Sequence, residues 1–149
     1  MVQESNSSKK SQSGYRLLSH TADLGLRLYG DTLADLFANA ARGLYGVMTD
    51  RRGIRPLIRQ EVEVEAADSG ALLVEWLNQL LYLFETTGFL GREIEIKEVT
   101  ANRLRASLKG EPLDLERHRL NTGIKAATYH NLEIKETAGG WQATIILDI

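Results

Sequence analysis

The sequence predicts an α+β fold of two layers, in which a mixed, mostly antiparallel β-sheet is covered by two amphipathic helices. Two segments repeat apolar residues at helical spacing, the first over 33–48 and the second from Leu72 to Phe84. Other segments, near both ends of the chain, alternate apolar and polar residues, as strands with one buried face do. Because the 149 residues hold no internal repeat or linker, we expect a disordered leader at 1–13 and one domain at 14–149.

Composition excludes several classes of site. The formal net charge of −2 argues against a broad phosphate-binding face, although it leaves room for a local basic patch. Without cysteine the chain has no disulfide, thiolate zinc site or cysteine nucleophile, so any metal must bind oxygen or imidazole. No apolar run approaches the roughly 20 residues that cross a bilayer, and the N-terminus lacks the apolar core of a signal peptide. We therefore expect a soluble cytoplasmic protein.

The first half of the domain is expected to hold two strands, a helix, a loop and a third strand, in the order 15–18, 24–29, 33–48, 49–58 and 59–66. Thr32 has the N-cap chemistry that begins a helix, and the apolar stripe that follows is expected to be core. The loop is basic, with arginines at Arg51, Arg52, Arg55 and, just beyond it, Arg59. Such a loop either contacts RNA or is simply solvated.

The second half begins with the most hydrophobic helix, which Asp68 caps and Gly88 follows. This helix should lie flat against the sheet, with Trp76 and Phe84 in the core. The rest is expected to be strands with one turn and one irregular polar segment, in the order strand 93–99, strand 103–109, turn 110–114, irregular segment 115–123, strand 124–135 and strand 141–147. His118 lies between arginines in the irregular segment and is expected to be solvated.

Carboxylates at the two ends of the domain point to a cation site. Asp23 lies where a polar turn enters a buried strand, so it needs a cation, N–H donors or water, and a turn or capping role would also satisfy it. At the other end, the Asp148 side chain and the Ile149 main-chain carboxylate repel each other unless a cation lies between them. Lys125 or a divalent metal would supply that charge. If Asp23 lies at the same end of the sheet, three carboxylates converge on a Ca²⁺- or Mg²⁺-type site; otherwise the C-terminal acids face water.

Other chemistry-bearing residues are sparse. His20 and His130 each lie near a threonine, and each is open to three roles: a metal ligand, a hydrogen-bonding strut or a partly buried imidazole. The chain lacks the phosphate-loop pattern G-x-x-x-x-G-K-[ST], a G-x-G-x-x-G opening a helix, and the nucleophile elbow G-x-S-x-G. Nothing in the sequence therefore demands an enzyme.

Five blocks, taken in order, resemble the archease family. They are His20-Thr-Ala-Asp-Leu-Gly25, a Tyr-Gly pair before a helix with Leu and Phe, Leu72-Leu-Val-Glu-Trp-Leu-Asn-Gln-Leu-Leu81, Lys125-Ala-Ala-Thr-Tyr-His130, and a final Trp…Leu-Asp-Ile. The resemblance covers about Tyr15 to Ile149 and leaves out the leader. One departure is Ala127, where many members carry valine.

This resemblance implies a small, non-catalytic protein cofactor of the RtcB-type tRNA-splicing RNA ligase, which joins a 3′-phosphate or 2′,3′-cyclic phosphate to a 5′-hydroxyl. Archeases promote guanylylation of that ligase and its repeated turnover. The resemblance also implies a divalent metal, Ca²⁺ first with Mg²⁺ or Mn²⁺ as alternatives, held by Asp23, Asp148 and Ile149. The residues expected to act on the partner are Lys125, His20 and His130.

Three rival interpretations remain. An RNA-binding module would use the basic loop at 51–59. A metal-dependent hydrolase would hold a catalytic ion at Asp23 and Asp148, with His20 or His130 as the base. A general chaperone is suggested by the helix-covered sheet alone.

Overall fold

The computed structural model describes residues 14–19 and 23–149, so the predicted leader at 1–13 and His20 lie outside the described residues. The elements, in chain order, are β1 (Tyr15–Ser19), β2 (Asp23–Gly30), α2 (Leu33–Met48), the 3-10 helix η1 (Arg51–Gly53), β3 (Ile58–Glu65), α3 (Ser69–Thr87), β4 (Phe89–Val99), β5 (Arg103–Pro112), β6 (Ala126–Thr137) and β7 (Gly140–Asp148). In this described part of the chain, neither helix is long and apolar enough to cross a membrane.

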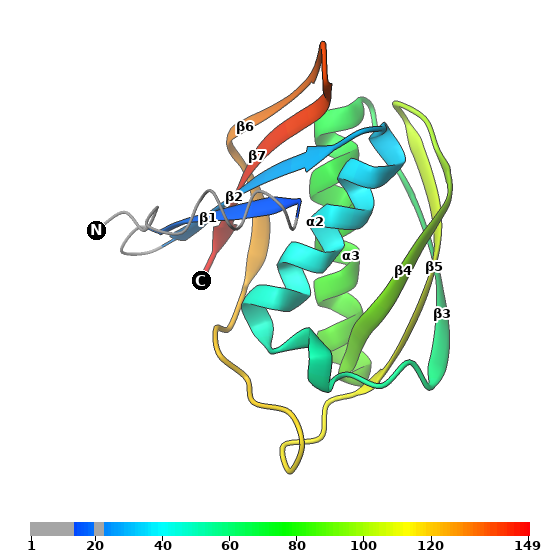
Figure 1. The fold of residues 1–149 in the computed structure, drawn as a ribbon, viewed down its shortest axis with the longest axis vertical. Helices are drawn as coiled ribbons and strands as arrows, with labels where there is room; N and C mark the ends of the chain where they lie inside the picture. The colour runs from blue at the N-terminus through cyan, green and yellow to red at the C-terminus, as the bar shows by residue number, and fades with distance from the viewer. Residues whose placement is uncertain (1–13, 20–22) are drawn as a thin grey trace.

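The strands form two separate antiparallel sheets with the helices between them (Figure 1). One sheet has the order β1-β2-β7-β6 and the other has the order β3-β5-β4. Helix α2 packs against β2 and β4, whereas α3 packs against β6 and β3. The α+β class with two helices and antiparallel strands is confirmed. The expected single sheet in two layers is corrected to two sheets in three layers.

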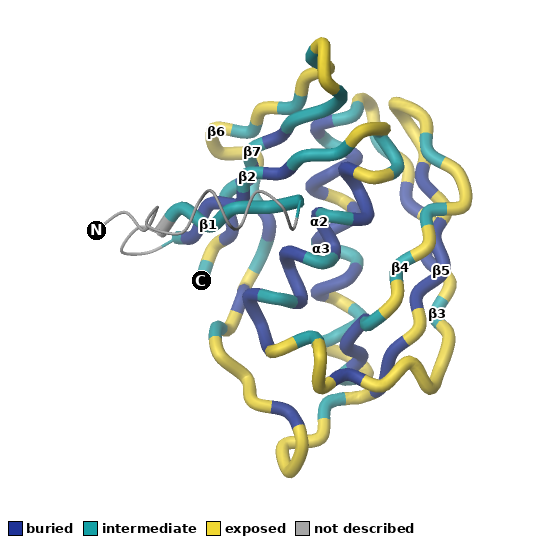
Figure 2. The backbone as a smooth tube through the Cα atoms, viewed as in Figure 1, coloured by how far each residue is buried: buried dark blue, intermediate teal, exposed yellow. Residues whose placement is uncertain are grey.

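Burial on more than one side of each helix explains the third layer (Figure 2). In α2 the predicted apolar stripe is buried, and so are Ala38 and Tyr45 beside it. A helix that is apolar beyond one stripe needs cover on more than one side. The prediction that Trp76 lies in the core is confirmed, since it is fully buried and its indole Nε1 donates to the Phe37 carbonyl oxygen at 2.9 Å. Phe84 is partly buried and packs against the core.

The expected turn at 110–114 is wrong in its first part, because β5 runs on to Pro112. Gly110 pairs with Ile58 on one side and with Gly91 on the other. A Cβ atom at Gly110 would lie only 1.8 Å from the Leu90 carbonyl oxygen, so the close approach of β4 requires glycine here. Gly110, which suggested a turn, is therefore needed for the close approach of the paired strands β4 and β5.

The expectation that His118 is solvated is also wrong. His118 is only 4% exposed, and its Nε2 lies 2.9 Å from Oε2 of Glu111, itself 6% exposed. The Asp114 amide donates to Nδ1 at 2.9 Å, so the neutral ring carries its proton on Nε2 and donates it to Glu111. Arg117 also donates to Glu111, as does the Arg55 amide at 2.7 Å. The buried carboxylate thus ties the β5–β6 connection to the loop after η1.

Hydrogen bonding sets the charge state of Glu111. Burial by itself would raise its pKa, but the hydrogen bonds from Arg117, the Arg55 amide and His118 outweigh burial and lower the pKa to about 2. Because the folded-state pKa is depressed, this carboxylate stabilises the fold above its ordinary pKa. That contribution is lost as the pH falls from about 4.5 toward about 2.

We predict that Glu111→Gln lowers the free energy of unfolding near neutral pH, and that the gap from the wild type narrows at roughly pH 3. Denaturant unfolding of both proteins at each pH measures the gap. Glu116→Gln, which changes an exposed acid in the same connection, is the control and should show no such narrowing. A gap that stays constant with pH would contradict this account of the network.

Candidate metal site

The pairing of β2 with β7 places Asp23 directly opposite Asp148. The neighbouring pair, Leu24 and Leu147, is buried toward the helices. Since side chains alternate along a strand, the two aspartates lie on the outer face of the four-stranded sheet. Side chains of directly opposed residues have their Cβ atoms about 5 Å apart. The sequence alone leaves open whether Asp23 lies at this end of the sheet, and the register places it there.

The third strand at this end is β6, which lies on the other side of β7. Ala126 pairs with Asp148, and the Lys125 amide donates to the Asp148 carbonyl oxygen at 2.7 Å. Lys125 is exposed, so its ammonium group is free to reach toward the acids or a partner. The main chain at Asp148 is therefore held from both sides.

An asparagine that the sequence analysis did not single out fixes the start of β6. Asn78 of α3 donates from Nδ2 to the Ala127 carbonyl oxygen at 3.1 Å, and its Oδ1 accepts from the Ala127 amide at 2.8 Å. These two bonds satisfy the free edge of β6 next to Lys125. A polar residue in the most hydrophobic helix was the available signal, because a polar group near a core must find a partner.

The two aspartates differ in their surroundings. Asp148 is exposed, whereas Asp23 is partly buried and its Oδ1 atom is buried without a hydrogen-bond partner among the described residues. A buried carboxylate oxygen with no donor is costly unless a cation or water meets it. Two opposed carboxylates also repel each other across the strands. Both features fit a cation bound between Asp23 and Asp148.

The rest of the predicted ligand set stays a prediction. Within residues 14–19 and 23–149, no group of three or more His, Cys, Asp or Glu side chains gathers closely enough to hold a metal ion. Ile149 follows Asp148 directly, and His20 lies outside the described residues. His130 is exposed in the irregular stretch of β6 between Thr128 and Glu133, where its Nε2 lies 3.3 Å from the side-chain Nδ2 of Asn131. It is four residues from Ala126, or roughly 13 Å in an extended strand.

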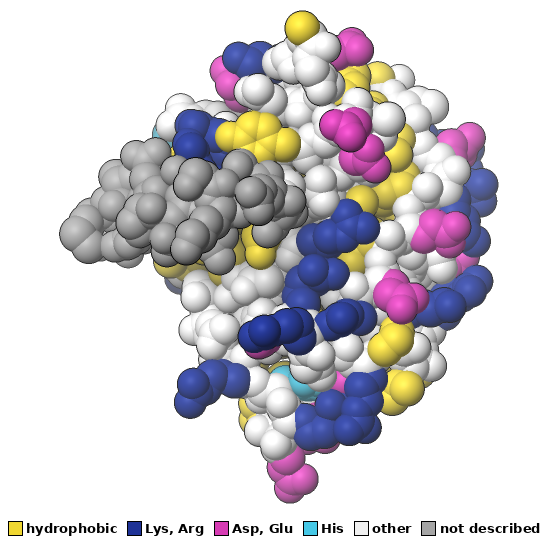
Figure 3. All heavy atoms as spheres, viewed as in Figure 1, with side chains coloured by type: hydrophobic (Ala, Val, Ile, Leu, Met, Phe, Trp, Pro, Cys, Tyr) yellow, Lys and Arg dark blue, Asp and Glu magenta, His cyan; other side chains and the backbone are white. Residues whose placement is uncertain are grey.

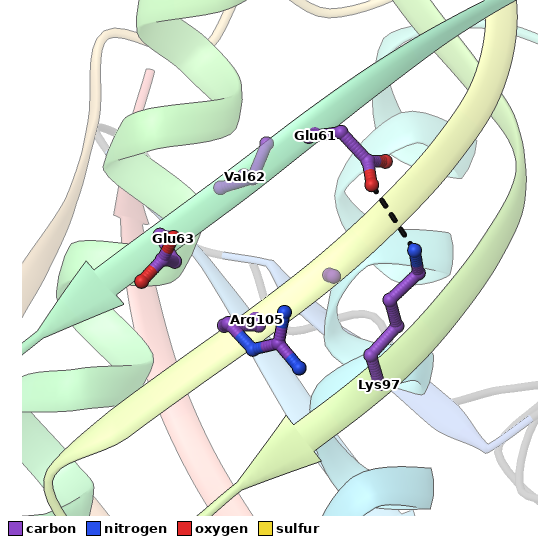
Figure 4. A pocket seen from close by; sticks show the side chains of 6 residues that line it. Glu61, Val62, Glu63, Lys97 and Arg105 are labelled. Atoms are coloured by element: carbon purple, nitrogen blue, oxygen red, sulfur yellow. Dashed lines mark hydrogen bonds and ion pairs between the residues drawn. The ribbon is translucent and has the colours of Figure 1, made fainter.

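The outer face of the other sheet carries many charges but offers no comparable site. A hollow of about 180 Å³ lies over β3, β5 and β4, lined by Glu61, Val62, Glu63, Lys97, Arg105 and Ala106 (Figure 4). Its charges are paired, because Lys97 Nζ lies 3.1 Å from Glu61 and Arg105 Nε lies 3.2 Å from Glu98. On β3 the exposed side of this face is acidic, with Glu61, Glu63 and Glu65 alternating with the buried Val62 and Val64. Among the described residues, none that lines this hollow has a buried oxygen without a hydrogen-bond partner, unlike Asp23.

The chain is similar to known proteins over most of its length. Residues 15–149 match the family described as "Archease protein family (MTH1598/TM1083)". Protein archease of Methanosarcina mazei is 37% identical over 139 residues, covering 91% of this chain and 95% of the relative. Protein archease of Thermococcus gammatolerans is 41% identical over 134 residues, covering 87% of this chain and 94% of the relative.

Two solved structures share the fold. The solution structure of protein 1598 of Methanobacterium thermoautotrophicum has a TM-score of 0.78 and 32% identity, covering 92% of this chain and 99% of that one. A crystal structure from Thermotoga maritima, described as an archease and possible chaperone, has a TM-score of 0.63 and 20% identity, covering 87% and 93%. At that identity the second likeness shows the fold alone.

We predict that Asp148→Asn stabilises the protein in a buffer with a metal chelator, because the substitution removes the repulsion from Asp23. The expected gain is about 0.2–1 kcal/mol, the usual size of a cross-strand pair effect. Added Ca²⁺ should raise the melting temperature of the wild type and leave that of the variant unchanged. Thermal unfolding with chelator, Ca²⁺ or Mg²⁺ measures both effects.

Glu136→Gln is the matched control, since Glu136 is an exposed acid at the other end of β6. This variant should keep the full response to Ca²⁺. If Asp148→Asn lowered the melting temperature in the presence of chelator, the two acids would not be a repelling pair. That result would contradict the predicted cation site.

Proposed function

The chain belongs to the archease family, and from this premise we propose that it is a non-catalytic activator of an RtcB-type tRNA-splicing RNA ligase. In this role it promotes guanylylation of the ligase and its multiple turnover. The observation that carries the proposal is the register of β2 and β7, which opposes Asp23 and Asp148 on the sheet face that points away from the helices. An activator that acts on another protein needs its functional groups outside the core, and these acids meet that condition.

Asp23 and Asp148 are the residues that would hold a divalent ion, with Ile149 as the predicted third contributor. Carboxylate oxygens suit Ca²⁺, Mg²⁺ and Mn²⁺ alike, and the family resemblance puts Ca²⁺ first. When bound, such an ion supplies positive charge that neutralises the two acids and attracts phosphate or carboxylate oxygens of a partner. Asp23, with its partly buried oxygen, would anchor the ion, while the exposed Asp148 would face the ligase.

Lys125 contributes a second positive charge at the same end of the sheet. Its main chain is fixed to Asp148, while its exposed side chain remains mobile on a four-carbon stem. A compact ammonium group of this kind steers a phosphate or a partner carboxylate toward the acids. We propose that this acidic end docks near the active site of the ligase, where a loosely held ion is delivered or positioned for nucleotidyl transfer.

Multiple-turnover RNA ligation by an RtcB-type ligase tests the proposal. We predict that wild-type protein increases the number of turnovers and that Asp148→Ala and Asp23→Ala each lose most of this stimulation. Lys125→Ala should weaken stimulation while leaving the melting-temperature response to Ca²⁺ intact, because Lys125 is not an expected ligand. Glu136→Ala should stimulate like the wild type, since it removes an acid away from the site.

Full stimulation by both aspartate variants would overturn the proposed role of the acidic site. Absence of stimulation by the wild type with the ligase from the same organism would overturn the activator function itself. RNA cleavage by the purified protein alone would instead support the hydrolase interpretation.

A chaperone-like role is the second candidate, favoured by large apolar side chains at the surface. Leu57 is 66% exposed and Leu115 is 73% exposed. The Thermotoga maritima protein of the same fold is described as a possible chaperone. Suppression of aggregation of an unrelated unfolding protein, unaffected by chelator and lost in a Leu57→Ser/Leu115→Ser variant, would support this role.

A further inference from the structure

Lys and Arg side chains gather in a band along α2 and the loops at the lower end of the molecule (Figure 3). This concentration stands out because the whole chain has a formal net charge of −2. Three arginines from different elements lie close together, since Arg51 of η1 interacts with Arg42 of α2 and with Arg92 of β4. We call these three residues the arginine corner.

Reciprocal hydrogen bonds hold two of the arginines together. Arg51 donates from its guanidinium to the Arg92 carbonyl oxygen at 2.8 Å, and Arg92 donates to the Arg51 carbonyl oxygen at 2.6 Å. Both side chains are partly buried, so their positions are fixed more firmly than those of free surface arginines. The Nε atom of Arg51 is buried with no hydrogen-bond partner among the described residues.

Arg42 completes the corner from the helix. Its guanidinium donates to Asn39 Oδ1 at 2.8 Å. Residues four apart share one face of a helix, so Arg42 lies one turn from Gly46. A Cβ atom at Gly46 would be 4.0 Å from Arg51 Cδ and 2.8 Å from the Tyr15 hydroxyl, which places Arg51 and Tyr15 over this glycine. The absence of a side chain at Gly46 therefore lets Arg51 lie against the helix near Arg42.

These three charges form no close ion pair in the described part of the chain, although Asp50, whose pKa is lowered mainly by hydrogen bonds from Arg52, is near enough to Arg92 for that charge to help lower it. In the described part of the chain, none of the three arginines has a carboxylate within ion-pair distance. The acid next to Arg51 in sequence, Asp50, pairs instead with Arg52 at 2.7 Å. Burial, followed by repulsion from Arg42 and Arg92, lowers the pKa of Arg51 below its ordinary value. The three-stranded sheet β3-β5-β4 differs, because its Arg103 and Arg105 pair with glutamates.

We propose that the arginine corner binds a backbone phosphate of an RNA strand, and that the basic band guides that strand. A guanidinium group can donate two parallel hydrogen bonds to the oxygens of one phosphate. Each guanidinium group has five N–H donors, and the hydrogen bonds of the corner described above use only some of them. Tyr15 lies beside the corner and presents its polar hydroxyl near Gly46. The exposed leucines of the described residues, Leu57, Leu115 and Leu120, lie on the loops and not among the three arginines, so the corner itself offers few of the apolar contacts that an acidic peptide would use.

This inference goes beyond the proposed ligase activation and does not depend on it. Other members of the band lie on loops joined near the end of α2. Thr49 donates to the Arg119 carbonyl oxygen at 2.7 Å, and Arg117 donates to the Gly53 carbonyl oxygen at 3.3 Å. Arg119 therefore continues the positive surface from the corner onto the β5–β6 connection, whereas Glu111 and Asp114 offset the charge of Arg117. A line of positive charges suits a polymer of phosphates better than a single free phosphate.

Fluorescence anisotropy of the full chain with a labelled single-stranded RNA, over a salt series and without ligase, tests the proposal. The variant R42Q/R92Q leaves the half-buried Arg51 in place. We expect it to bind about tenfold or more weakly and to lower the salt slope by about 1.4, since two positive charges are removed and each contributes about 0.7 on a single strand. R103Q/R105Q removes the same number of positive charges from β5 of the three-stranded sheet and should change the affinity for RNA much less. R42K/R92K, which keeps charge without the fork, should bind with intermediate affinity.

Competition identifies the source of the phosphate. Unlabelled RNA should displace the probe far better than inorganic phosphate or polyglutamate of matched charge. Equal displacement by polyglutamate would indicate an acidic protein partner, and full displacement by inorganic phosphate would indicate a free-phosphate site; either result would overturn the proposal. Equal loss of binding in R42Q/R92Q and R103Q/R105Q, with both variants melting like the wild type, would also overturn it.

Discussion

The antiparallel pairing of β2 with β7 is the contact on which the rest of the molecule depends. It joins strands from opposite ends of the chain at the centre of the four-stranded sheet. Its inner face buries Leu24 and Leu26 against Leu147 and Ile145, and a slip of one residue would turn these side chains toward water. The hydrophobic register on one face therefore fixes the geometry of the acids on the other. Packing holds Asp23 opposite Asp148 although the two carboxylates repel, which is the arrangement a cation would relieve.

Local patterns predicted most of the secondary structure, but they did not predict how the strands divide. Both helices and the strands at both ends of the chain follow from apolar spacing, which local sequence records directly. Alternation of apolar and polar residues shows that a strand has a buried face, but it does not show which strands pair with each other. The sequence therefore predicted one sheet where the structure has two. The signal for a third layer was present in α2, where Tyr45 lies outside the apolar stripe and is nevertheless fully buried. A large aromatic residue beside a stripe indicates that a second layer covers the helix.

For the candidate sites too, local patterns identified some residues and missed those that depend on long-range contacts. The sequence singled out Asp23 and Asp148 but left open whether they meet, because the pairing of β2 with β7 is a contact between opposite ends of the chain. The burial of His118 could not be predicted, since its partner Glu111 lies on a strand that continues past the glycine that had suggested a turn. The role of Asn78 depends on an edge strand about fifty positions later in the chain. The basic loop around Arg51 was visible in the sequence, but Arg42 and Arg92 join it only through folding. Sites made by long-range contacts are the part that local patterns miss.

The central claim is that Asp23 and Asp148 form a cation site, and binding of a paramagnetic ion tests it most directly. Mn²⁺ added in small amounts to isotope-labelled, metal-free protein broadens the amide signals nearest to it in nuclear magnetic resonance spectra. The account predicts that the amides of Asp23, Asp148 and Lys125 broaden first, and that excess Ca²⁺ restores them. First broadening at the glutamates of β3, or uniform broadening without restoration by Ca²⁺, would contradict it.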